Sequence, residues 1–123
     1  MAITAVTLTA RERMALLFSE EPVYAVLHHA EPNPSDPLAT QVAMAGQIGM
    51  PVAWSVTSTV LSNSMPITWT GITGAGEVPA WVALCSDPAG KEILFYGNPD
   101  GLAASTADWD SFVVEAGTMI IAF

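Results

Sequence analysis

Residues 52–72 read Val-Ala-Trp-Ser-Val-Thr-Ser-Thr-Val-Leu-Ser-Asn-Ser-Met-Pro-Ile-Thr-Trp-Thr-Gly-Ile. Apolar side chains at positions 52, 54 and 56 alternate with small or polar side chains at positions 53, 55 and 57. Because successive side chains of a strand point to opposite faces, residues 52–61 are predicted to form one half-buried strand. The Ser-Asn-Ser of residues 62–64 favours a turn, and the alternation resumes over residues 67–72. This stretch therefore predicts a protein built mainly of antiparallel strands.

The same stretch lies inside a segment of forty residues, 37–76, that contains no Asp, Glu, Lys or Arg. An average soluble domain is about 25% charged, so a segment of this length would ordinarily carry about ten such residues. Polar residues and glycines interrupt its apolar residues every few positions, and no run approaches the roughly 18 apolar residues of a membrane-spanning helix. Strands with a neutral outward face pack well on another subunit, so the composition favours assembly.

The N-terminal part of the chain predicts one helix, over residues 9–19. Thr9 is expected to cap it, Glu12 stands in the capping-box position, and Pro22 follows its end. The prolines at positions 32, 34 and 37 predict a loop. The sequence leaves open whether residues 38–50 form a strand or an arm that reaches to a neighbouring molecule.

Further strands are predicted over residues 23–29, 78–86 and 93–97, with a turn at residues 87–90. A loop over residues 98–110 leads to a segment at residues 112–117 and a last strand at residues 118–123. Short strands at regular spacing after one helix predict an antiparallel β-sandwich, jelly-roll-like, with one short N-terminal helix. The length predicts a single domain over residues 1–123, in which residues 1–21 hold the N-terminal segment and helix and residues 22–123 the sandwich.

The charge is strongly negative: Arg11, Arg13 and Lys91 are the only basic residues against twelve acidic ones, for a net charge of −9. Nucleic acids and anionic membranes bind through Lys and Arg, so neither is expected as a partner. Cys85 is the only cysteine, which excludes an intrachain disulfide, and its apolar neighbours predict a small buried side chain. The N-terminus lacks the features of a secretory signal, so synthesis in a reducing cytoplasm is expected.

Two groups of titratable residues are candidates for a reactive site. His28 and His29 are adjacent on a predicted strand, where their side chains point to opposite faces and cannot chelate one ion without a bulge. Asp108 and Asp110 lie in a predicted loop, with Glu115 further on, but a bare loop offers nothing to separate the pKa values of two carboxyl groups. We expect no catalytic residues and no metal-binding residues.

Two other patterns are candidates for a binding site. The Gly-Ile-Thr-Gly-Ala-Gly of residues 71–76 is followed by Glu77, so it has neither the lysine of a phosphate-binding loop nor the order of the dinucleotide fingerprint. The tryptophans at positions 54, 69, 81 and 109, with two tyrosines, offer rings for a sugar-binding groove, but three of the four lie on predicted strands, where core packing is the default. We expect no cofactor and no cofactor-binding residues.

Segments along nearly the whole chain share one resemblance. The first two are residues 8–18, Leu-Thr-Ala-Arg-Glu-Arg-Met-Ala-Leu-Leu-Phe, and residues 23–32, Val-Tyr-Ala-Val-Leu-His-His-Ala-Glu-Pro. The third combines residues 52–56, Val-Ala-Trp-Ser-Val, with residues 61–69, Leu-Ser-Asn-Ser-Met-Pro-Ile-Thr-Trp. The last two are residues 82–97, Val-Ala-Leu-Cys-Ser-Asp-Pro-Ala-Gly-Lys-Glu-Ile-Leu-Phe-Tyr-Gly, and residues 114–121, Val-Glu-Ala-Gly-Thr-Met-Ile-Ile. In this order they resemble a family of small bacteriophage virion proteins, the phage tail-fibre or minor tail proteins with a β-sandwich domain. The proline-rich loop departs from that family by lacking its glycines, and the 98–110 connection by its length.

The resemblance implies a non-enzymatic virion structural protein, a tail-fibre or tail-tip component that assembles through protein–protein contacts. Its expected partners are other virion proteins and copies of itself in a homo-oligomer, of which a trimer is one form. Its expected location is the virion, after synthesis in the host bacterial cytoplasm. A capsid decoration protein on the phage head is the first alternative. A carbohydrate- or receptor-binding module for a host-surface glycan is the second.

Overall fold

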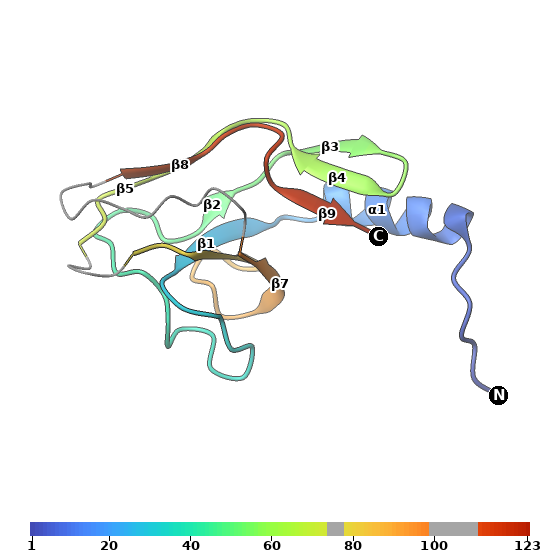
Figure 1. Cartoon of the computed structure of the whole chain (residues 1–123), viewed down its shortest axis with the longest axis horizontal. Coiled ribbons are helices and arrows are strands. Elements are labelled where there is room, and N and C mark those ends of the chain that lie inside the picture. Colours follow the sequence, from blue (N-terminus) through green and yellow to red (C-terminus); the bar gives the residue numbers. More distant parts are fainter. Residues whose placement is uncertain (74–77, 99–110) are drawn as a thin grey trace.

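The computed structural model describes residues 1–73, 78–98 and 111–123. The fold is mainly β and sandwich-like with one N-terminal helix, as the sequence predicts (Figure 1). Its elements in chain order are α1 (Leu8–Glu20), β1 (Tyr24–His28), β2 (Met50–Pro51), β3 (Trp54–Thr57), β4 (Val60–Asn63), β5 (Ile67–Thr70), β6 (Trp81–Cys85), β7 (Ile93–Gly97), β8 (Ser111–Val114) and β9 (Ile120–Ala122).

Two antiparallel layers enclose the core. One layer is the four-stranded sheet β2-β1-β6-β7. The other consists of the sheets β3-β4-β9 and β5-β8, and Figure 1 shows that β4 runs into β5 and β8 runs into β9 along one bent ribbon. Apolar side chains from both layers meet between them, among them Leu27 and Leu84 from the first and Leu61 and Ile121 from the second. Burial of these alternate positions holds the two layers together.

Trp69 is the largest fully buried side chain and lies between the layers. Its indole Nε1 donates hydrogen bonds to the backbone oxygens of Ala25, at 3.1 Å, and Ile48, at 3.2 Å. A buried tryptophan needs a partner for its N–H, and here two carbonyls of the opposite layer and its flanking loop provide it. The residue therefore adds a polar link to the apolar contact between the layers.

Asn63 fixes the bend of the ribbon. Its side-chain Nδ2 donates to the backbone oxygens of Met65, at 3.0 Å, and Glu115, at 2.9 Å, while its Oδ1 accepts from the backbone N–H of Met119 at 2.9 Å. The sequence predicts a turn residue here, but Asn63 ends β4 and is buried. The prediction was wrong because the amide finds backbone partners more than fifty residues away, which local turn chemistry does not reveal.

The predicted strand over residues 52–61 is two strands. β3 and β4 are joined by a tight turn in which Ser58 has a φ of 55°, a left-handed conformation that is uncommon for a residue other than glycine. The turn pairs Thr57 with Val60. The predicted alternation does hold within β3, where Trp54 and Val56 are half-buried and the residues between and after them are exposed.

The helix is confirmed, but its cap is Thr7 rather than Thr9. The Thr7 backbone is extended, with φ −72° and ψ 160°, and its Oγ1 accepts a hydrogen bond from the N–H of Ala10 at 3.1 Å. Helix α1 therefore begins at Leu8, two residues earlier than a cap at Thr9 would allow. It ends at Glu20, because the following Pro22 disfavours helical backbone at the residue before it.

Met50 already belongs to β2, and residues 38–49 form neither a strand nor an arm that leaves the fold. They run as an irregular segment back over the first layer, where the backbones of Gln41 and His28 form an isolated antiparallel bridge. The side-chain Nε2 of Gln41 donates to the backbone oxygen of Ala89 at 2.9 Å. Val42 is buried in the core. This segment therefore covers its own sheet.

Candidate interaction surface

His28, the last residue of β1, and His29, which follows it, lie in different environments. His28 is fully buried, and its Nδ1 is 2.7 Å from Thr40 Oγ1, whereas His29 is half-buried. Burial, with a smaller contribution from the neighbouring His29, lowers the pKa of His28 to about 4. His28 is therefore a neutral core side chain near pH 7. In the described ranges no three His, Cys, Asp or Glu side chains gather closely enough to hold a metal ion.

The turn between β6 and β7 contains a buried thiol and an ordered carboxylate. Burial, reinforced by the charge of Asp87, raises the pKa of the Cys85 thiol to about 12, so the thiol is unreactive at neutral pH. Burial opposes ionisation of Asp87 itself, but backbone N–H groups outweigh it and lower the pKa of that carboxyl. The N–H groups of Lys91 and Glu92 donate to Asp87 at 2.9–3.0 Å. Cys85 is thus a buried side chain of the predicted hairpin, and Asp87 holds the backbone of its turn.

The structure describes only some of the other candidate residues of the sequence. Asp108, Trp109 and Asp110 lie outside the described residues, as do residues 74–77 of the glycine-rich segment. Gly71 is described, with a φ of 72° that favours glycine. Glu115 is exposed, and its backbone oxygen accepts the hydrogen bond from Asn63.

The three described tryptophans do not share one surface. Trp69 is buried in the core, and Trp54 is half-buried with its ring 6.2 Å from that of Phe18. Trp81 lies beside Tyr96, with ring centroids 6.2 Å apart, and Tyr96 is exposed. The two rings come from β6 and β7, neighbouring strands of the first layer, so this pair is a candidate aromatic surface on that layer.

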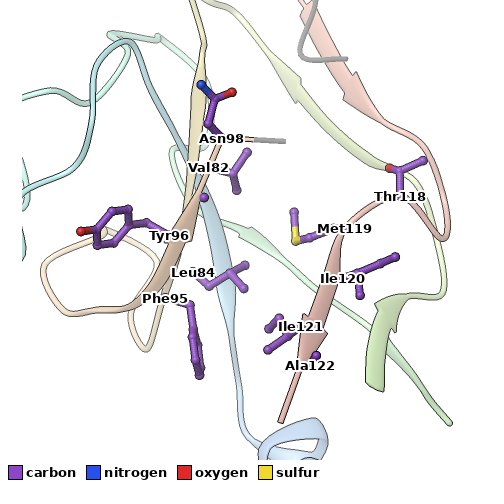
Figure 2. Close-up of a pocket in the computed structure, with 11 residues that line it drawn as sticks. Val82, Leu84, Phe95, Tyr96, Asn98, Thr118, Met119, Ile120, Ile121 and Ala122 are labelled. Carbon is purple, nitrogen blue, oxygen red and sulfur yellow. The ribbon is translucent and has the colours of Figure 1, made fainter. Parts of the chain in front are cut away.

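A groove opens between β7 of the first layer and β9 of the second, with a volume of about 430 Å³. Figure 2 shows Val82 and Leu84 on one side and Met119 and Ile121 on the other, pointing toward one another across it. Tyr96 points away from it. The lining is mostly apolar and contains no charged side chain: Val82, Leu84, Phe95, Tyr96, Gly97, Asn98, Thr118, Met119, Ile120, Ile121 and Ala122.

A second apolar surface covers the N-terminal segment and the outer side of α1. Residues 1–7 belong to no helix or strand and extend away from the rest of the fold (Figure 1). Ile3 is 86% exposed, and in α1 Leu16 is 52% and Leu17 65% exposed. Large apolar side chains exposed along one helix and on the segment before it are typical of an interaction surface. The sequence does not identify this surface, because the leucines of α1 lie on more than one side of the helix and their pattern alone does not show which side packs.

Within the described residues 37–73 of the uncharged segment, β5 presents hydroxyl groups outward, in line with the predicted neutral face. In β5, Thr68 and Thr70 are exposed, while Ile67 and Trp69 are buried. Together with the groove and the N-terminal surface, these faces allow contact with another protein without removing charges from water.

Comparison of the chain with models of known protein families, with curated proteins and with solved structures finds no match. No helix in the described part of the chain has the length and hydropathy to cross a membrane. The candidate site is therefore defined by the geometry of the chain itself: a neutral groove at one open side of the sandwich and an exposed apolar N-terminal surface.

Proposed function

We propose that this chain is a non-enzymatic structural protein of a bacteriophage particle, a tail-fibre or tail-tip component that works by packing on copies of itself and on other virion proteins. The observation that carries the proposal is the exposed apolar surface of residues 1–7 and α1, where Ile3, Leu16 and Leu17 face solvent. The resemblance of the chain to small phage virion proteins supplies the biological setting. The neutral outward faces of the strands support the same role, because they pack without desolvating charges.

Self-association is tested by light scattering after size-exclusion chromatography. Leu16→Asp is expected to lower the molar mass, because it places a charge in the apolar surface of α1. Leu38→Asp is a matched control: Leu38 is a leucine of nearly equal exposure, 49% against 52%, in the loop after β1. A wild-type chain that is monomeric at all concentrations would contradict the proposal.

Location is tested by imaging particles from a host lysate with a gold-labelled antibody against the chain. Label confined to the tail end is the expected result. Label over the head would replace the tail assignment by capsid decoration. Absence of label from all particles would refute the virion role.

A carbohydrate- or receptor-binding module is the second candidate, and the pair Trp81 and Tyr96 is the observation that favours it. Sugar rings stack on exposed aromatic faces. Titration with host-surface glycans is then expected to quench tryptophan fluorescence in the wild type and to leave Trp81→Ala unchanged. A flat titration of the wild-type chain would exclude this role.

A further inference from the structure

Two strand edges lie open on either side of the groove. In the described residues β7 pairs only with β6, and β9 pairs only with β4. The outer edge of each strand therefore presents unpaired backbone N–H and C=O groups beside the groove, at the open side of the sandwich. An unpaired edge is a template for one more strand, and apolar side chains below it favour an apolar segment. The groove of β7 and β9 thus has the character of a strand-binding site.

The chain contains a segment that matches this site. In residues 1–7, four side chains are β-branched, and there is neither a charge nor a proline. Such a composition has a high propensity for strand pairing. Seven extended residues span about 23 Å and a five-residue strand such as β7 about 17 Å, so the segment is long enough to pair along the whole edge.

The position of this segment favours the groove of another molecule over its own. Phe18, near the end of α1, packs on Phe95 of β7 with ring centroids 5.2 Å apart. Thr7 precedes Phe18 by eleven residues, or about 16 Å of helix, and residues 1–7 continue away from the fold (Figure 1). To enter its own groove the segment would have to reverse direction at the helix cap.

The charges of the chain also favour contact between copies. Two of the three basic residues, Arg11 and Arg13, lie just after the apolar segment, where Glu12 is the only acidic residue before position 20. The other eleven acidic residues lie from position 20 onward, with Lys91 alone opposing them. A contact between the N-terminal part of one copy and the body of the next therefore joins a positive region to a negative one.

We propose that residues 1–7 of one copy lie as an added strand in the β7–β9 groove of the next copy. The inference deepens the proposed function, on which it rests for its setting, by naming the partner of the groove. Ile3 and its neighbours supply the apolar side chains that cover Leu84 and Met119 at the floor of the groove. The strand completes both open edges and links copies head to tail.

A directed disulfide tests this contact. Ala122→Cys places a thiol on the exposed edge of β9, and this thiol is activated as the mixed disulfide with thionitrobenzoate. Thr4→Cys places a reduced thiol in the N-terminal segment of a second preparation. Mixing the two is expected to release thionitrobenzoate at least tenfold faster than mixing Thr4→Cys with an activated Ser35→Cys control, in which the thiol is on an exposed loop residue. Cys85 is buried and gives no background.

Equal rates with the two activated sites would overturn the proposal. A chain that carries both Thr4→Cys and Ala122→Cys distinguishes a segment bound in the groove of another copy from one folded back into its own groove. Disulfides that form within one chain at high dilution, without disulfides between chains, would also overturn the proposal. As an independent measurement, deletion of residues 1–6, which keeps the Thr7 cap, is expected to reduce the oligomer to a monomer by light scattering. An unchanged mass would count against the added strand.

The outcomes separate this inference from the proposed function. Label on phage particles and an oligomer that survives the deletion would leave the virion role standing and remove the strand exchange. A rapid directed disulfide without label on any particle would leave the exchange standing and remove the virion role.

Discussion

Replacing Asn63 with aspartate tests the bend between the sheets with almost no change of shape. The carboxylate keeps the oxygen that accepts from the N–H of Met119, but it loses the N–H groups that donate to the backbone oxygens of Met65 and Glu115. Each carbonyl left without its donor in a partly buried site costs about 1–1.5 kcal/mol, and repulsion by the new charge adds to this. We expect the free energy of unfolding to fall by about 3 kcal/mol, and Tm to fall by about 10 °C.

The same substitution has an expected pH dependence. Burial near two carbonyl oxygens raises the pKa of an aspartate at position 63 above the value of about 3.9 in the unfolded chain. The folded state then binds the proton more tightly, so the loss of stability grows as the pH rises above about 4 toward the raised pKa. Protonated aspartate also regains one donor. The loss is therefore expected to be smaller at pH 5 than at pH 8.

Urea unfolding followed by circular dichroism measures both quantities. Ser64→Asp is the matched control, because it adds the same charge at an exposed neighbouring residue and is expected to change stability by less than about 0.5 kcal/mol. A loss at position 63 no larger than that of the control at pH 8 would refute the argument that the three side-chain hydrogen bonds hold the bend.

Three further predictions follow from local geometry. Gly90→Ala is expected to cost about 2 kcal/mol in urea unfolding. About 1 kcal/mol comes from its φ of 75°, and the rest arises because the new Cβ, 2.5 Å from Gln41 Nε2, displaces that side chain from its hydrogen bond to the backbone oxygen of Ala89. Gly117→Ala, with a φ of 80° and open space around the new Cβ, is expected to cost only ~1 kcal/mol. The pKa of His28 in the folded chain, about 4, lies below its value of 6.5 in the unfolded chain. Its contribution to the free energy of unfolding is therefore complete above pH 6.5 and is lost as the pH falls toward 4. The free energy of unfolding should fall by about 2 kcal/mol between pH 7 and pH 5, and this fall should be absent from the pH profile of His28→Gln. Thr7→Ala is expected to cost about 1 kcal/mol through loss of the cap, and Thr9→Ala close to none, in thermal unfolding by circular dichroism.

The sequence predicts the strands that local pattern determines. Alternation identifies β3, the Asp-Pro-Ala-Gly turn identifies the β6–β7 hairpin, and Pro22 identifies the end of α1. The turn at Ser58 was missed because its left-handed backbone is carried by a serine instead of the glycine or asparagine typical of such turns.

The groove was not predictable from local pattern. Phe95 and Ile120 read as ordinary strand residues, and they become groove residues only because β7 and β9 are both outermost in their sheets. Strand order is set by contacts between distant parts of the chain. The N-terminal surface was not predicted either, although its signal is local: the first ten residues carry no charged side chain.

The two hydrogen bonds of Trp69 give the molecule a built-in reporter of its own opening. The indole proton is shared between Ala25 of the first layer and Ile48 of the loop beside it, while the ring belongs to the second layer. Deuterium can replace this proton only when the layers part, since the ring is fully buried. Its exchange rate, read from a single resonance in the nuclear magnetic resonance spectrum, therefore measures how often the sandwich opens.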